Sequence, residues 1–387
     1  MKIISVVGAR PNFMKIAPFV KAIAAHNATG PSRPIEHILV HTGQHYDVRM
    51  SEGFFHSLGI PDPDINLEIG SGSHAEQVGQ TMIAFEKVLL QEKPDWVVVV
   101  GDVNATLACS VAAKKLCVKV CHIEAGLRSG DMTMPEEVNR LVTDRLSDLL
   151  LTPDALSSDN LRKEGVTEDR ICFVGNIMID TLEANRDKAA ALDPADVLRD
   201  NLLDPAFVCP DLSGDFALLT MHRPSNVDCK EVLEPILNFL TDEVARRMPL
   251  IWPIHPRAQK MLQNFGLWEQ AVACPNLVLL HPIGYNEMLR LNMQATIMLT
   301  DSGGLQEECC VLGTPCLTLR WNTERPVTLK EHGGASVLVG NNVERIRSEF
   351  LAALESGRVP QRPELWDGRT AERCVGCLVK GGWERDA

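Results

Sequence analysis

The sequence predicts an α/β protein with two doubly wound, Rossmann-like domains, each built on a parallel sheet. Three observations predict this class. The chain has 387 residues, and at about 100 to 200 residues per domain this length favours two domains. Short runs of β-branched residues alternate with longer amphipathic stretches along nearly the whole chain, which is typical of βα units. Hydrophobic residues make up 45% of the chain and charged residues 23%, the usual balance of a protein with a sizeable buried core.

The expected elements follow one another in the same rhythm in both halves of the chain. In the first half we expect strands near residues 3–7, 36–41, 96–100, 118–123, 149–151 and 171–174. Helices fill the gaps, for example over residues 75–90 and 136–146. In the second half we expect strands near residues 216–221, 250–254, 277–280, 296–300, 316–319 and 336–339.

The boundary between the two domains is expected between residues 176 and 213, because the stretch 192–213 is rich in Asp, Pro and Leu and is the least sheet-like. We assign residues 1–178 to the first domain and 179–367 to the second. After Pro360 the strands stop, and a final helix-like segment over residues 370–380 could pack on either domain.

Charge and cysteine usage exclude several classes of partner. Lys and Arg number 38 against 51 Asp and Glu, a formal net charge of −13, and so acidic a surface repels nucleic acid and anionic membranes. The N-terminus lacks a secretory apolar region and no apolar run has spanning length, so we expect a cytoplasmic protein. The 12 cysteines are scattered, and the one pair with CxxC spacing is Cys374 and Cys377. This pattern favours reduced thiols over zinc or disulfides.

Ligands of open α/β sheets bind beyond the carboxyl ends of the strands, so the residues there are the candidates for function. Gly8-Ala9-Arg10-Pro11 follows the first strand, and Lys15 lies inside the helix that begins there. The free N–H groups of that helix, with Arg10 and Lys15, favour an anion such as a phosphate or an anionic leaving group. The alternative is a turn followed by two solvated cations.

A second anion site is predicted after the strand at residues 296–300. Gly303 and Gly304 let the backbone approach a pyrophosphate closely, and Ser302 adds a hydroxyl. Glu308 lies about one turn into the helix, where it could accept hydrogen bonds from a ribose. Arg325 is the nearest cation to balance a diphosphate. A glycine turn with a capping aspartate is the alternative.

Carboxylates follow two strands that we expect to be neighbours in the first sheet. Asp102 comes after the strand at 96–100, and Glu124 after the strand at 118–123, so both are predicted at one edge of the sheet. Glu136 and Arg140 share a helix face by their four-residue spacing, which also fits a surface ion pair. Three carboxylates at one cleft can hold different pKa values and supply both an acid and a base. With two sheets facing each other, the cleft between the domains is the natural site.

His222 is a further candidate at the end of a strand. It follows the strand at 216–221 and could neutralise a phosphate or donate a proton, although a lone histidine is often a structural residue.

Residues 70–75 match the GxGxxA pattern, with Asp95 20 residues beyond the last of them. Asp95 precedes its strand, whereas the acid that binds the ribose of NAD should follow one, so the pattern does not indicate NAD binding.

Seven segments, taken in order, resemble the non-hydrolysing UDP-N-acetylglucosamine 2-epimerases. Each alone is weak evidence, but together they are highly specific and run through nearly the whole chain. They are Gly8-Ala9-Arg10-Pro11, Gly101-Asp102, His122-Ile123-Glu124-Ala125-Gly126-Leu127-Arg128, Pro135-Glu136-Glu137-Val138-Asn139-Arg140, His222-Arg223, Asp301-Ser302-Gly303-Gly304 with Gln306-Glu307-Glu308, and Thr323-Glu324-Arg325-Pro326.

The resemblance implies a fold of the glycosyltransferase-B type with two domains facing a cleft, a homodimer, and a C-terminal helix (about residues 368–387) that returns to the first domain. It implies neither a metal nor a nicotinamide cofactor. It implies that UDP-GlcNAc loses UDP to give 2-acetamidoglucal, and that UDP then adds back after reprotonation on the opposite face. The product, UDP-ManNAc, is a precursor of surface polysaccharides.

The resemblance also implies roles for individual residues. The acid and base are expected among Asp102, Glu124 and Glu136, with Arg140 and His222 in support. Which carboxylate takes which proton stays open. The residues expected to bind the nucleotide are Arg10, Lys15, His222, Ser302, Gly303, Gly304, Glu308 and Arg325.

The chain departs from many members of that family in three places. The loop 43–47 and the segment 70–74 look like a branch that also contains 2-epimerases of UDP-diacetamido-uronic acids, and Pro224-Ser225 stands where many bacterial members carry Arg-Glu. These departures bear on allosteric binding of a second UDP-GlcNAc, for which the loop with Gln44 and His45 is the relevant region. The alternatives are a diacetamido-uronate substrate, a hydrolysing 2-epimerase, a glycosyltransferase, and a catalytically inactive sensor of nucleotide sugars.

Overall fold

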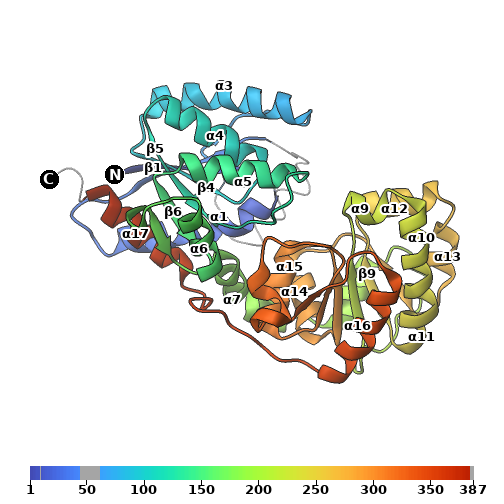
Figure 1. Cartoon of the computed structure of the whole chain (residues 1–387). Coiled ribbons are helices and arrows are strands. Elements are labelled where there is room, and N and C mark those ends of the chain that lie inside the picture. The colour runs from blue at the N-terminus through green and yellow to red at the C-terminus, as the bar shows by residue number, and fades with distance from the viewer. Residues whose placement is uncertain (9, 44–61, 384–387) are drawn as a thin grey trace. The chain divides into compact units, whose positions relative to one another are not determined.

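A computed structural model describes residues 1–8, 10–43 and 62–383 of the chain (Figure 1). The chain divides into two compact units. The first unit consists of Met1–Ala184 together with Pro363–Ala387, and the second of Asn185–Arg362. Each unit is built on its own parallel sheet.

The sheet of the first unit has seven strands among the described residues, in the order β3-β2-β1-β4-β5-β6-β7. All neighbours run parallel, so every strand ends at the same edge. The order reverses direction at β1, where strands β2 and β4 lie on either side. Ligands of doubly wound sheets bind at such a point. The strands are β1 (Lys2–Val7), β2 (Glu36–His41), β3 (Ile65–Asn66), β4 (Trp96–Val100), β5 (Lys119–Ile123), β6 (Leu149–Thr152) and β7 (Ile171–Phe173).

Helices connect these strands and cover the sheet, because a parallel sheet must bury both of its faces. Strands β4 and β6 show this burial most fully, because both are buried at every position, and β5 is buried at all but its first. The helices are α1 (Arg10–Ala28), α3 (His74–Glu92), α4 (Asn104–Lys115), α5 (Pro135–Leu146), α6 (Ala155–Lys163), α7 (Ile177–Ala190) and α17 (Thr370–Trp383), with a short 3₁₀ turn η1 (Glu168–Arg170).

The C-terminal helix α17 packs in the first unit, where it contacts α1 and β6, and Figure 1 shows it in red beside them. Its start is fixed by Asp180 of α7, whose carboxylate accepts hydrogen bonds from the backbone N–H of Thr370 (3.0 Å) and of Ala371 (2.7 Å). These bonds satisfy N–H groups at the start of α17 that have no partner inside the helix. The segment before the helix is held as well, because the indole N–H of the buried Trp366 donates to the carbonyl oxygen of Pro153 at 2.9 Å.

The sheet of the second unit has six parallel strands in the order β10-β9-β8-β11-β12-β13. Its strands are β8 (Ala217–Thr220), β9 (Leu250–Pro253), β10 (Leu277–Leu280), β11 (Ile297–Thr300), β12 (Cys316–Thr318) and β13 (Ser336–Leu338). Its helices are α8 (Pro194–Asn201), α9 (Pro224–Val227), α10 (Lys230–Phe239), α11 (Ala245–Arg247), α12 (Pro256–Asn264), α13 (Trp268–Ala273), α14 (Tyr285–Gln294), α15 (Gly303–Leu312) and α16 (Val343–Ser356), with a π turn η2 (Leu240–Val244) and two 3₁₀ turns, η3 (Pro326–Thr328) and η4 (Lys330–His332).

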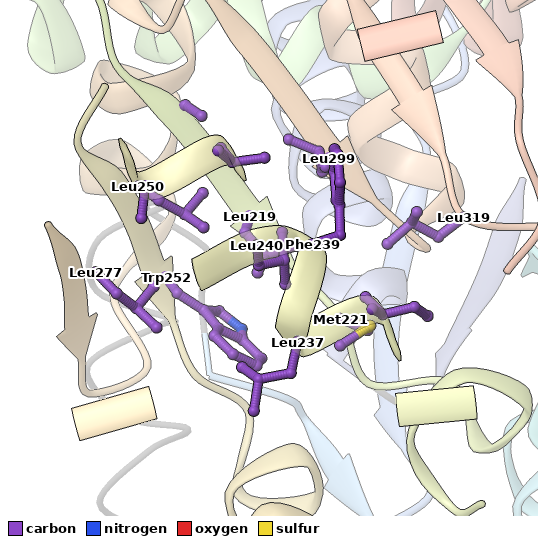
Figure 2. Close-up of a cluster of buried hydrophobic side chains, with 14 of the residues drawn as sticks. Leu219, Met221, Leu237, Phe239, Leu240, Leu250, Trp252, Leu277, Leu299 and Leu319 are labelled. Atoms are coloured by element: carbon purple, nitrogen blue, oxygen red, sulfur yellow. The ribbon is translucent and has the colours of Figure 1, made fainter. Parts of the chain in front are cut away.

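One face of this second sheet packs against α10 and its continuation. Figure 2 shows Trp252 of β9 among leucines of neighbouring strands, with Leu237 and Phe239 of α10. Trp252 is fully buried. Burying each large apolar side chain stabilises the fold by about 1.5 to 3 kcal/mol. The core therefore fixes the positions of the strands, and with them the loops that follow.

The strands and helices expected from the sequence are confirmed, within two residues at most ends and three at the C-terminal end of α17. The structure adds β3, which consists of Ile65–Asn66 and pairs with the end of β2. A strand of two residues is too short to show an alternation of apolar and polar residues, so the sequence carries no periodic signal for it.

The expectation that the cysteines are all reduced is wrong at one pair. Cys172 of β7 and Cys377 of α17 form a disulfide, and the other ten cysteines are free. The two residues lie 205 positions apart in the sequence, so only the return of α17 to the first unit brings them together. No group of three or more His, Cys, Asp or Glu within the described ranges could hold a metal ion, and none of the described helices is long and apolar enough to cross a membrane.

The GxGxxA match at residues 70–75 has a structural explanation. Ser73 caps the N-terminus of α3, where its hydroxyl accepts from the N–H of Glu76, while the Glu76 carboxylate accepts from the N–H of Ser73. Asp95 accepts a hydrogen bond from the backbone N–H of Lys2 at 2.7 Å, at the amino end of the sheet. The position expected for Asp95 before its strand is confirmed.

Candidate functional site

The carboxylates of the first unit lie at the carboxyl ends of β4 and β5, which are adjacent and parallel. Val100 of β4 is in register with Ile123 of β5, so the residues that follow them emerge side by side. Asp102 follows Gly101, and Glu124 directly follows β5. The sequence-based expectation that Asp102 and Glu124 share one edge of the sheet is confirmed.

Glu124 has an unusual backbone conformation. Its φ is +71°, a region that costs a residue with a side chain about 1 to 3 kcal/mol and that is most often retained at functional sites. Its carboxylate pairs with the ammonium of Lys15, which reaches it from α1, and both side chains are buried. The second carboxylate oxygen of Glu124, Oε1, is buried and has no hydrogen-bond partner among the described residues.

Gly101 is the point at which these groups converge. Its φ is +69°, and a Cβ placed on it would lie 3.3 Å from Asn12 Nδ2, 3.3 Å from Lys15 Nζ and 3.6 Å from Glu124 Oε2. Asn12 Nδ2 also donates to the carbonyl oxygen of Val100 at 2.7 Å. A side chain at Gly101 would therefore crowd the amide of Asn12 and the ammonium of Lys15, and it would contact the carboxylate of Glu124.

Asp102 is held by α5. Arg140 of α5 forms an ion pair with the Asp102 carboxylate, and Asn139 Nδ2 donates to the Asp102 carbonyl oxygen at 2.8 Å. The Asp102 side chain is 24% exposed, whereas the Arg140 side chain is 2% exposed. Asp102 is thus fixed from its buried side and open on the other, which suits a group that exchanges protons with a substrate.

Arg140 has a second partner in Glu137, three residues before it, at 2.6 Å and 2.9 Å. Burial alone would raise the pKa of Glu137, but hydrogen bonds from the backbone N–H of Ser129 and Gly130 and from Arg140 lower it. Glu137 is therefore a charged anchor for Arg140. Glu136, which the sequence singled out, is half-exposed on α5. Its four-residue spacing from Arg140 puts the two residues on one helix, but the buried carboxylate that pairs with Arg140 is Glu137.

In the second unit, Asp301 joins the ends of two adjacent strands, β8 and β11. Its Oδ2 atom accepts hydrogen bonds from the backbone N–H of His222 at 2.9 Å and of Arg223 at 2.8 Å, and from Asn226 Nδ2 at 3.1 Å. Its Oδ1 lies 3.0 Å from His222 Nδ1. Burial alone would raise the pKa of Asp301, but the hydrogen bond and charge of His222 and the N–H donors lower it.

These bonds orient His222. Its Nδ1 faces Asp301, while its side chain remains 43% exposed, and its ring centroid lies 5.2 Å from that of His255. An imidazole anchored at one nitrogen by a buried carboxylate presents its other nitrogen in a fixed direction. His222 is therefore held at the carboxyl edge of this sheet with part of its ring exposed.

The helix α15 begins directly after Asp301. Ser302 is its N-cap residue, and the Ser302 side chain makes no capping hydrogen bond. The first N–H groups of a helix lack partners within the helix and favour an anion. At Gly303 a Cβ would lie 2.7 Å from Arg325 Nη1 and 2.8 Å from Glu324 Oε1, so glycine is needed there for the ion pairs to pack beneath the turn.

Arg325 is buried and already paired with two carboxylates, those of Glu307 at 2.7 Å and of Glu324. The sequence placed it as the cation nearest to a diphosphate. The structure brings it to the start of α15, against Gly303. Because its two partners offset its charge, the attraction for an anion here depends more on the N-terminus of α15 and on His222.

Glu308 lies in the second turn of α15 and is buried. Burial raises its pKa to about 7, the charge of Glu307 adds to the rise, and Tyr285 and Asn292 oppose it. Its Oε2 has no hydrogen-bond partner among the described residues. Glu308 can thus act as a hydrogen-bond donor or acceptor near neutral pH.

The structure places the other residues singled out by the sequence as follows. Arg10 is the first residue of α1, while Gln44 and His45 lie outside the described residues. Ser302, Gly303 and Gly304 lie together at the start of α15. Sequence reasoning missed five residues of the first unit whose contacts hold the side chains around Asp102 and Glu124. They are Asn12, His122, Glu137, Asn139 and Asp144. A histidine inside an apolar strand, as at His122, was the one signal that pointed to them.

Comparison with known proteins decides the family. The family model described as UDP-N-acetylglucosamine 2-epimerase matches residues 28–379. The chain belongs to this family. It is 40% identical over 382 residues to the UDP-N-acetylglucosamine 2-epimerase of Methanocaldococcus jannaschii, an alignment that covers 98% of this chain and all of that protein.

A solved structure and a second relative extend the family comparison. The crystal structure of the Methanocaldococcus jannaschii UDP-GlcNAc 2-epimerase in complex with UDP-GlcNAc and UDP superposes with a TM-score of 0.87 at 39% identity, covering 98% of this chain and 100% of that one. A UDP-2,3-diacetamido-2,3-dideoxy-D-glucuronate 2-epimerase of Pseudomonas aeruginosa is 39% identical over 344 residues, 88% of each chain. The α/β architecture with two parallel sheets, of the glycosyltransferase-B type expected for this family, is confirmed.

Proposed function

We propose that the chain is an isomerase that interconverts UDP-GlcNAc and UDP-ManNAc by elimination and re-addition of UDP. The observation that carries the proposal is the pair of carboxylates at the ends of β4 and β5, in a chain that aligns over 98% of its length with a UDP-N-acetylglucosamine 2-epimerase. Asp102 is partly open beside Arg140, and Glu124 has one buried oxygen with no hydrogen-bond partner among the described residues.

The reaction needs an acid and a base but no oxidant. A carboxylate removes the proton from C2, the electrons of the C2–H bond form the C1=C2 double bond, and the bond between C1 and the diphosphate oxygen breaks. UDP leaves with the electron pair of the broken C1–O bond, and the sugar becomes 2-acetamidoglucal. A proton then adds to C2 from the opposite face, and a diphosphate oxygen attacks C1.

Residues of the first unit supply the proton transfers. The C2 proton is scarcely acidic, so its removal must be coupled to the departure of UDP. Asp102, Glu124 and Glu136 are the acid and base candidates. Arg140 fixes Asp102, and the ammonium of Lys15 offsets the charge of Glu124. Reprotonation from the opposite face favours two groups with different protonation states.

Residues of the second unit bind the nucleotide. The N-terminus of α15, with Ser302, Gly303 and Gly304, receives the diphosphate, and His222 neutralises it. Glu308 accepts hydrogen bonds from the ribose, and Arg325 supports the turn from below. The family resemblance also makes Arg10 and Lys15 candidates for offsetting the charge of the diphosphate. Exclusion of water protects the glycal from hydrolysis.

The identity of the sugar substituents and the oligomeric state rest on less evidence than the reaction type. The 39% identity to the Pseudomonas aeruginosa enzyme supports a UDP-diacetamido-uronate as the second candidate substrate. The homodimer and a role in polysaccharide biosynthesis remain predictions from the family resemblance, and the cytoplasmic location remains a prediction from the sequence. The same holds for allosteric binding near Gln44 and His45.

The experiment is incubation of the purified chain with UDP-GlcNAc in heavy water, without NAD. Deuterium at C2 of a UDP-ManNAc product supports the proposal. Free ManNAc would indicate a hydrolysing enzyme, and activity on the diacetamido-uronate alone would indicate the second candidate.

A variant separates chemistry from nucleotide binding. Asp102→Asn should suppress C2 exchange by at least about 100-fold, the usual size of a general acid or base contribution. Its UDP affinity by calorimetry should stay within about twofold, because we assign the nucleotide contacts chiefly to the second unit. Asp159→Asn removes an exposed carboxylate from the same unit and serves as the control. Equal losses of exchange and UDP affinity in Asp102→Asn would contradict this division of roles.

A further inference from the structure

A buried ion pair lies beneath the carboxylates of the first unit. His122 lies in β5 and is fully buried. Its Nδ1 is 2.6 Å from Asp144 Oδ1, and its Nε2 is 2.8 Å from the carbonyl oxygen of Gly101. A carbonyl oxygen only accepts hydrogen bonds, so Nε2 carries a proton.

The direction of the hydrogen bond between His122 Nδ1 and Asp144 Oδ1 follows from the surroundings of Asp144. The other oxygen of Asp144, Oδ2, accepts hydrogen bonds from the backbone N–H of Gly126 at 3.0 Å and from Arg128 Nη1 at 2.7 Å. Burial alone would raise the pKa of Asp144, but the charges and hydrogen bonds of His122 and Arg128 lower it. Asp144 is therefore a carboxylate, whose oxygens only accept hydrogen bonds, so Nδ1 of His122 is the donor to Oδ1.

This pair holds both turns that carry the candidate carboxylates. The carbonyl group of Gly101 directly precedes Asp102, and the Gly101 φ is +69°. The N–H of Gly126 lies two residues after Glu124, which itself has a φ of +71°. One ion pair thus fixes the backbone on both sides of the candidate site.

We propose that His122 and Asp144 are positioning residues that hold Asp102 and Glu124 in the geometry needed for proton transfer at the sugar C2. The proposal rests on the proposed function. Stability alone does not explain the pair, because a buried ion pair is often no more stabilising than well-packed apolar residues of similar volume. A histidine ring held at both nitrogens instead fixes the direction of a peptide carbonyl.

Two variants separate the two hydrogen bonds. In His122→Gln the side-chain amide can reach the position of Nε2 and donate to the Gly101 carbonyl. In His122→Asn the amide reaches only the position of Nδ1, beside Asp144. Both variants remove the positive charge and keep a polar side chain. His37→Gln is the control, because His37 is a partly buried histidine of β2 in the same sheet, and its Nε2 lies 2.9 Å from Ser5 Oγ.

The expected result is a loss of kcat with little change in KM. The kcat for C2 exchange should fall about 10-fold in His122→Gln and about 100-fold in His122→Asn, since misplacement of a reacting group by about 1 Å can cost 100-fold. The KM for UDP-GlcNAc and the Kd for UDP should stay within about twofold. Equal kcat losses in the two variants, wild-type kcat in both, or a parallel loss of UDP affinity would overturn the proposal.

A second measurement does not depend on activity or on the folding of a variant. Neutron diffraction of the wild-type protein at pH 7.5 should show deuterium on both ring nitrogens of His122 and none on Asp144. A single deuterium on the ring, or one on Asp144, would overturn the assignment. If wild type shows both deuterons but does not exchange the C2 hydrogen of UDP-GlcNAc, the proposed function fails and the ion pair stands.

Discussion

Glu308 allows a quantitative test of the electrostatics of the second unit. Burial raises its pKa to about 7 from a usual value of 4.5. Because the folded-state pKa is the higher one, the folded chain binds the proton more tightly than the unfolded chain does. The stabilisation that results is fully present below pH 4.5 and is lost as the pH rises through 7.

The replacement Glu308→Gln removes this titration while keeping the shape of the side chain. One pKa unit corresponds to about 1.4 kcal/mol, so the wild-type chain should lose about 3 kcal/mol from this group between acidic and alkaline pH. The variant should not lose it. We expect the free energy of unfolding of the variant, relative to wild type, to rise by about 2 to 3 kcal/mol between pH 5 and pH 8.5.

Urea unfolding at the two pH values, monitored by circular dichroism and tryptophan fluorescence, measures this difference. Glu355→Gln, at an exposed carboxylate of α16 in the same unit, is the control and should follow wild type at both pH values. If Glu308→Gln differs from wild type by the same amount at pH 5 and pH 8.5, then Glu308 does not titrate between those pH values and the reasoning fails.

Two further predictions concern the first unit. Gly126 has a φ of +82°, and a Cβ there would lie 2.3 Å from the Ser157 carbonyl oxygen, so Gly126→Ala should lower the free energy of unfolding by about 2 to 4 kcal/mol. Gly130→Ala, with a φ of +72° and nothing within 4 Å, should cost about 1 kcal/mol, and similar urea midpoints for the two variants would refute the steric argument. Asp180→Ala should remove about 1 to 2 kcal/mol from the start of α17. Amide hydrogen exchange of α17 should then be faster than in wild type, and unchanged exchange would show that Asp180 does not hold the helix.

Much of the candidate site follows from the order of the elements alone. In a parallel sheet every strand ends at the same edge, so a residue that follows a strand is placed there whatever the rest of the sequence does. This is why Asp102, Glu124, His222 and Ser302 could be predicted from the sequence. An apolar run before these polar residues and a helical segment after them were enough to predict their position.

Contacts between residues distant in sequence could not be found in this way. The pairing of Lys15 with Glu124 spans α1 and β5, and Arg140 selects Glu137 rather than Glu136 because Glu137 lies on the buried face of α5. Spacing in the sequence allowed either carboxylate. Burial decided between them, and burial depends on which other helices and strands cover that face.

The sequence by itself determined the alternation of strands and helices, and with it the edges at which polar side chains gather, because apolar periodicity is a local property of the chain. Only the tertiary structure decided that Cys172 meets Cys377, and that His122 lies between Asp144 and Gly101. Each of these depends on segments far apart in sequence being brought into contact. Such contacts are selected by the packing of the whole unit and leave no periodic trace in the residues that make them.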